Sequence, residues 1–270
     1  MSRPPAVPAS FGELLARLEA GLVVPARPPE EGSSSGPGLP DWLWQVVAVL
    51  YDGQGTAAAK DWAFRLHGEL GRLGGRVPFT VVHDWHAHAV APMLAEACAR
   101  RGWSPQPQRA VQDLHVRALA GQRTAASEWQ AVLGPALREA YRLAYAYDDA
   151  FAHAYAGAHA YAVANAYGAE RAAEFAHGYA ELNTGANVTS FADGNALANA
   201  GATAVAWAAA DAHAYAAACP FAHARVYAHA WAGRERTAVR EGTGEREERL
   251  RTAHRRLAGG LVDSLARAAA

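Results

Sequence analysis

From Ala144 to Trp231, alanine occupies nearly every even-numbered position, and the odd positions carry tyrosine, histidine, asparagine, phenylalanine and aspartate. Strict alternation is nominally a strand pattern, which would place alanine on one face and the aromatic and polar residues on the other. Alanine is, however, the best helix former and is depleted in strands, and strands rarely exceed about ten residues. The stretch therefore has two interpretations, long helices or alternating Ala-X β structure.

A helical projection of this stretch separates its charged side chains from its large apolar ones. At about 100° per residue, most charged residues fall in one arc and most large residues in the opposite arc, whereas a strand would mix them. The charged set is Arg138, Arg142, Asp149, Glu170, Arg171, Glu174 and Glu181, and the apolar set is Leu137, Leu143, Tyr147, Phe151, Tyr155, Tyr161, Phe175 and Tyr179. The pattern favours a helix over residues 135–181, with Gly157 and Gly168 as places where it bends or breaks.

A turn is predicted at residues 182–189, LNTGANVT, because asparagine and glycine are typical of turns. Ser190 and Asp193 are candidate caps of a second helix, which runs to Trp231 with an interruption at Cys219-Pro220. Small residues let two such helices approach closely, while tyrosine and phenylalanine fill the remaining gaps. We therefore expect an antiparallel pair of long helices.

Three segments are predicted along the chain. Residues 1–40 contain a short amphipathic helix and a Pro/Gly/Ser linker, 41–123 a small N-terminal helical region, and 124–270 the alanine-rich long-helix bundle. Residues 77–82, VPFTVV, are the best strand candidate, although Pro78 and the short length suit an extended connector equally well. One short strand makes no sheet, so the fold class predicted is all-α.

Composition narrows the partners and the compartment. The net charge of −1 and the pI near 6.9 give no reason to expect nucleic acid or an anionic membrane as a partner. No run of eighteen apolar residues and no signal-peptide pattern occurs, and Cys98 and Cys219 have no CxxC spacing. We expect a cytoplasmic protein with reduced thiols.

Histidines are the candidate metal ligands. His83, His86 and His88 lie within six residues together with Asp84, and imidazole nitrogens suit zinc or iron. The HExxH signature is absent, so a helix capped by Asp84 with structural histidines is the competing interpretation. Glu174 and His177 form one Glu-x-x-His pair of the kind found in di-metal bundles, which need a second pair on another helix.

No nucleophile motif or phosphate-binding loop is present, which argues against enzyme classes that depend on them. We therefore predict an interaction or scaffold protein that binds a protein partner or a second copy of itself through the long helices. The expected contact residues are Tyr147, Phe151, Tyr155, Tyr161, Tyr179, His213, Tyr215 and Tyr227. The alternative is a metal-binding protein or metal-dependent enzyme that uses zinc or iron at the histidine cluster.

Overall fold

The computed structural model describes residues 10–20, 39–145, 147–233 and 243–269. Every regular element in these ranges is helical, which confirms the all-α prediction and rejects the alternating β alternative. The elements are α1 (Phe11–Glu19), α2 (Asp41–Gly53), α3 (Thr56–Arg72), α4 (Thr80–Trp85), η1 (His86–Val90), α5 (Ala91–Arg100), α6 (Gln106–Leu119), α7 (Ala126–Ala144), α8 (Tyr147–Ala164), α9 (Ala169–Ala209), α10 (Ala212–Ala217), α11 (Pro220–Ala232) and α12 (Thr243–Arg267). Within the described ranges, none of these helices is long and apolar enough to cross a bilayer.

The helical body is organised around α4, η1 and α5, which follow one another without a loop. The strand candidate at 77–82 is wrong, because its last three residues form the first turn of α4. The histidine-rich segment widens into the π turn η1, where the Ala91 N–H donates to the His86 carbonyl five residues back. Pro92 explains the wide turn: it has no N–H to donate, and its ring would clash with the carbonyl of His88 in a regular helix.

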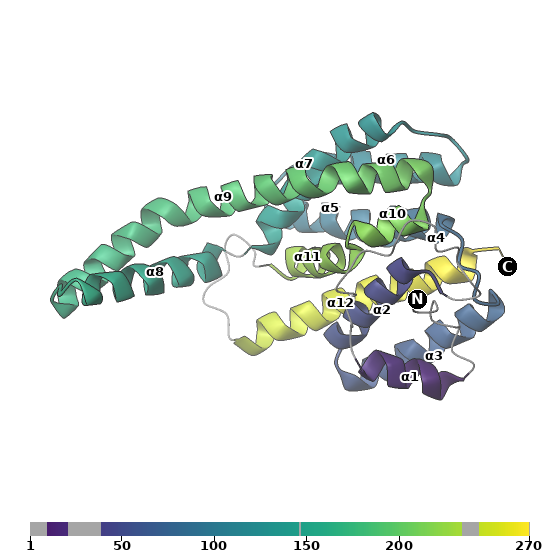
Figure 1. Cartoon of the computed structure of the whole chain (residues 1–270), viewed down its shortest axis with the longest axis horizontal. Coiled ribbons are helices and arrows are strands. Elements are labelled where there is room, and N and C mark those ends of the chain that lie inside the picture. The colour runs from purple at the N-terminus through teal and green to yellow at the C-terminus, as the bar shows by residue number, and fades with distance from the viewer. Residues whose placement is uncertain (1–9, 21–38, 146, 234–242, 270) are drawn as a thin grey trace, which may run out of the picture.

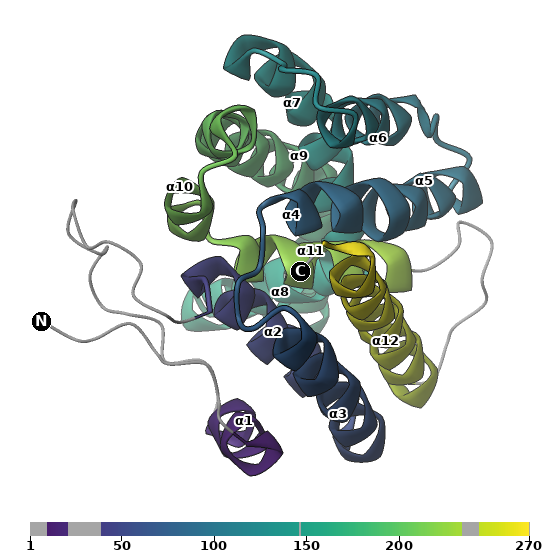
Figure 2. The ribbon, with the colours of Figure 1, turned by 90° about the vertical axis from the view of Figure 1, so that its right-hand side faces the viewer.

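The C-terminal helix α12 packs against α2, α3 and α4 (Figure 2). Two buried indoles fasten it: the Trp62 Nε1 donates to the Ala258 carbonyl at 2.8 Å, and the Trp85 Nε1 donates to the Leu257 carbonyl at 3.0 Å. Gly260 permits the closest approach, since a Cβ there would lie 2.3 Å from the Ala89 Cβ. One continuous hydrophobic core joins these N-terminal and C-terminal elements.

Figure 1 shows α8 and the first half of α9 projecting from the body as an antiparallel hairpin, while the second half of α9 packs on α7. The seam consists of small residues at every fourth position, the spacing at which helix ridges interlock. On α8 these are Ala150, Ala154, Ala158 and Ala162; on α9 they are Ala172, Ala176, Ala180, Thr184, Val188, Ala192, Ala196, Ala200 and Ala204. All of them are even-numbered and buried or half-buried. The seam therefore accounts for every second one of the even-numbered positions, and the alanines between them remain to be explained. The intervening alanines of α8, such as Ala152 and Ala156, are exposed.

The predicted turn at 182–189 is wrong, because these residues lie inside α9. The chain reverses earlier, between α8 and α9, where Ala166 adopts a left-handed conformation with φ 59°. The Tyr167 N–H donates to the Ala162 carbonyl, a Schellman-type helix end. Of the two predicted break points, Gly168 is the N-cap of α9, whereas Gly157 lies inside α8. The predicted interruption at Cys219-Pro220 separates α10 from α11.

Candidate functional site

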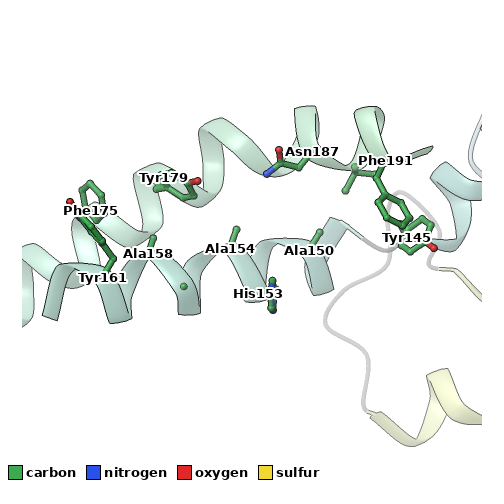
Figure 3. Close-up of a pocket in the computed structure, with 12 residues that line it drawn as sticks. Tyr145, Ala150, His153, Ala154, Ala158, Tyr161, Phe175, Tyr179, Asn187 and Phe191 are labelled. Atoms are coloured by element: carbon green, nitrogen blue, oxygen red, sulfur yellow. The ribbon is translucent and has the colours of Figure 1, made fainter. Parts of the chain in front are cut away.

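A groove of about 700 Å³ lies between α8 and α9. Figure 3 shows Ala150, Ala154 and Ala158 on α8 directed toward α9, with Asn187 of α9 across the opening. Methyl groups fill little space, so the middle of the hairpin is left open where a leucine or phenylalanine would have closed it. The groove is thus a direct consequence of the alanine-rich sequence.

Aromatic side chains close the two ends of this groove. At the end nearer the body, Tyr145 and Phe191 pack edge to face with ring centroids 4.5 Å apart. At the end nearer the tip, Phe175 contacts Tyr161 at 6.1 Å and Tyr179 at 6.3 Å between centroids. These separations are typical of attractive ring pairs, which hold the rings in place while leaving part of each exposed.

Large apolar side chains that remain exposed are concentrated on this hairpin and its continuation. Of thirteen such residues in the described part of the chain, ten lie between positions 145 and 205. They are Tyr145, Tyr161, Val163, Tyr167, Phe175, Tyr179, Leu182, Phe191, Leu197 and Val205. Exposed apolar side chains that are concentrated on one element mark a binding site more often than scattered exposed residues do.

The described side chains that line the groove include no Asp, Glu, Lys or Arg; their polar groups are His153, Asn187 and the tyrosine hydroxyls. The charged residues of α9 face elsewhere. Glu181 lies 3.6 Å from the His177 Nδ1, and Asp193 forms an ion pair of 2.7 Å with Arg138 of α7. Among the described side chains, the groove surface therefore carries no carboxylate, ammonium or guanidinium group.

The structure disperses the expected contact residues. Tyr161 and Tyr179 line the groove, whereas Phe151 and Tyr155 are half-buried outside it, near His177 and His159 respectively. The side chain of Tyr147 lies outside the described residues, and His213 is exposed on α10. Tyr215 and Tyr227 are in the core, 1% and 4% exposed, and not at a surface.

Sequence reasoning missed Tyr145 and Phe191 as groove residues. Because a chain reversal is predicted at residues 182–189, Phe191 is expected near the start of a separate helix. In the structure it follows Asn187 by one helical turn of α9. The detectable signal was the spacing Phe175, Tyr179, Asn187 and Phe191, which repeats in multiples of four residues along one side of α9.

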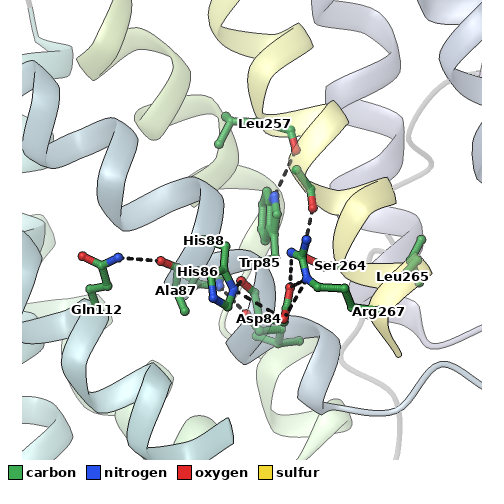
Figure 4. Close-up of polar contacts among 12 residues, drawn as sticks. Asp84, Trp85, His86, Ala87, His88, Gln112, Leu257, Ser264, Leu265 and Arg267 are labelled. Atoms are coloured by element: carbon green, nitrogen blue, oxygen red, sulfur yellow. Dashed lines mark hydrogen bonds and ion pairs between the residues drawn. The ribbon is translucent and has the colours of Figure 1, made fainter. Parts of the chain in front are cut away.

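The predicted metal ligands separate into two environments. His83 and His86, three residues apart on one helical face, are buried at 4% and 2% exposure. His88 points to the opposite side: it is exposed, with its Nδ1 3.4 Å from an Asp84 oxygen, and Asp84 also pairs with Arg267 of α12 (Figure 4). The Asp84 carboxylate, at the end of α4, thus contacts both His88 of η1 and Arg267 of α12.

His115 of α6 takes the place beside His83 and His86. Its Nδ1 lies 3.0 Å from the His83 Nδ1, so that one ring donates and the other accepts, and its ring stacks on His86 at 4.9 Å. Trp129 and Trp207 pack against the His115 ring at 4.8 and 4.5 Å. The sequence signal for His115 was its place four residues after Val111, on the apolar face of α6.

Burial keeps these imidazoles neutral. It lowers the pKa of His83 to about 4, of His86 to about 3, and of His223 on α11 to about 4, and it lowers the pKa of His115 well below its ordinary value. The Nε2 atoms of His86, His115 and His223 are buried without a hydrogen-bond partner in the described structure. A cavity of about 20 Å³, enough for one water molecule, adjoins His86.

Within the described residues, no three His, Cys, Asp or Glu side chains are arranged to hold a metal ion. Among these residues, Glu174 and His177 therefore belong to no such group. The histidine cluster is accordingly part of the aromatic core, and the groove is the feature open to a ligand. Comparison with protein-family models, curated proteins and solved structures finds no significant match to this chain.

Proposed function

We propose that this is a cytoplasmic helical interaction or scaffold protein that binds another polypeptide through the α8–α9 hairpin. One observation carries the proposal: a neutral groove of about 700 Å³, framed by partly exposed aromatic side chains, lies on an element that projects from the body. Aromatic residues are enriched, and charged residues depleted, at the centres of protein interfaces.

The extent of the surface favours a polypeptide over a small molecule. Pockets for small ligands bury most of the ligand's surface, and the volume of this groove is within their usual range of about 300–1,000 Å³. The exposed apolar residues, however, continue beyond the groove to Leu182 and Leu197. A small molecule would leave those side chains uncovered, whereas a protein surface can cover them together.

The hairpin is also held firmly enough to serve as a binding platform. The helix α9 continues from the hairpin into the body without interruption over 41 residues. In the body it is tied to α7 by Asp193, which pairs with both Arg138 and Arg142. A preorganised surface binds more tightly because less conformational entropy is lost on association.

A site-specific photo-cross-linker tests the proposal. Placed at Tyr161, which is 58% exposed, it is expected to give discrete protein adducts in the cells that make this protein, and the adducts should disappear in a Tyr179→Glu background. The matched control is the same cross-linker at Val116 of α6, which is 48% exposed and far from the groove in sequence. Absence of adducts at Tyr161, or equal adducts at both positions, would contradict the proposal.

Elemental analysis tests the competing class. The interaction proposal requires no zinc or iron in the purified chain. A stoichiometric metal that is lost in a His86→Ala variant, while circular dichroism shows the variant still folded, would overturn the proposal in favour of a metal-dependent protein.

A further inference from the structure

We propose that the occupant of the groove is a second copy of this chain, bound through the same face of its own hairpin. This inference rests on the proposed interaction function and names its partner. Three properties of the groove carry it: the aromatic area that it exposes, its lack of charged side chains, and the presence of exposed rings and an alanine floor on one surface.

The exposed area is close to what a stable dimer needs. The five aromatic residues that line the groove are between 37% and 58% exposed, and side chains of this type present about 200 Å² each when open. Together they offer about 450 Å², more than half of the roughly 800 Å² per partner in a standard interface. The alanine floor, His153 and Asn187 add to this area.

Neutrality removes the main obstacle to self-association. A surface that meets its own copy brings like charges together, and facing like charges cost several kcal/mol. None of the twelve lining residues is Asp, Glu, Lys or Arg, although Glu170, Glu174 and Glu181 lie on the same helix. The carboxylates remain outside the face that the second copy would cover.

The same face also supplies both halves of a complementary contact, as a two-fold symmetric interface requires. The partly exposed aromatic cluster of Tyr161, Phe175 and Tyr179 lies near the tip, and the floor of Ala150 and Ala154 lies toward the body (Figure 3). A two-fold axis between cluster and floor places the cluster of each copy over the floor of the other. The two hairpins then form a four-helix arrangement.

Sedimentation equilibrium of the full chain over a concentration series tests the inference. The unmodified chain is expected to be a dimer, and Tyr179→Glu should raise the dissociation constant about 30-fold or more, because it places a carboxylate in the buried contact. The matched control is Val116→Glu on α6, which is 48% exposed and does not belong to the hairpin, and it should leave the dimer intact. Far-UV circular dichroism verifies that both variants are folded.

A monomeric unmodified chain at high concentration would overturn the inference, as would equal dissociation by both variants. The cross-linking experiment then separates this failure from failure of the proposed function. Adducts at Tyr161 with twice the mass of the chain support the second copy. Adducts only with a different protein retain the proposed function and refute the second copy, and absence of adducts refutes both.

Discussion

Acidification should unfold this protein through its buried histidines. His83, His86 and His223 have pKa values of about 4, 3 and 4 in the folded state because burial penalises the charged imidazole. In the unfolded chain each titrates near 6.5. Between these values the unfolded state binds protons that the folded state cannot, so the free energy of unfolding falls as the pH falls.

The size of the effect follows from these values. For one histidine, lowering the pH from 7 to 5 removes about 2 kcal/mol of stability, since the folded form stays neutral over this range. The three residues together remove about 6 kcal/mol, and His115, whose pKa burial also lowers, adds to the loss. Typical domains are stable by only about 5–15 kcal/mol, so unfolding near pH 5 is expected.

Urea denaturation monitored by far-UV circular dichroism at pH 7, 6 and 5 measures this effect. The variant His86→Leu removes one buried imidazole and should lessen the pH slope by about 1.4 kcal/mol per unit below pH 6. The matched comparison is Leu133→Ala, which alters the same buried core without removing an imidazole and should lower stability equally at all three pH values. A loss of less than about 1 kcal/mol between pH 7 and pH 5 in the unmodified chain would refute neutral burial of the cluster.

Two further pairs of substitutions test the packing of the helices. Gly260→Ala should destabilise the fold by about 1–3 kcal/mol, because its Cβ would lie 2.3 Å from the Ala89 Cβ; its neighbour Gly259→Ala, which has open space, should stabilise α12 by about 0.5–1 kcal/mol. Thermal unfolding measures both, and equal effects would contradict the close approach of α12 to η1. In the hairpin seam, Ala176→Leu should cost about 1–3 kcal/mol and increase amide hydrogen exchange in α8, whereas Ala186→Leu, exposed on the same helix, should change stability by less than about 0.5 kcal/mol. Equal tolerance of both leucines would show that the four-residue seam is not the packed face.

The helical class was accessible from sequence because it rests on local preferences: alanine favours helix strongly whichever helices pack together. The antiparallel pairing of α8 with α9 was not predicted, because α8 and the start of α9 lie within the single helix expected over residues 135–181. Gly168 and Cys219-Pro220 were visible as breaks for the same reason, since glycine and proline have distinctive backbone preferences.

The other breaks carried no such signal. Ala166 and Ala210 both adopt left-handed conformations, with φ of 59° and 51°, at positions where glycine would ordinarily stand. Each is retained because the helices on either side gain more by packing than the strained residue loses, which is of order 1 kcal/mol. Because these turns occur at alanines, the sequence predicted a turn at LNTGANVT instead. Those residues, although typical of turns, lie inside α9.

The sequence by itself determined that this chain is helical and that alanine dominates its long helices. Only the tertiary structure decided which alanines form the seam, that His115 joins His83 and His86, and that Tyr215 is buried while Tyr161 is exposed. The physical reason is that alternation by two selects no face of a helix with 3.6 residues per turn. A face is chosen only when a second helix packs against it, and the groove exists only because that packing is done by methyl groups.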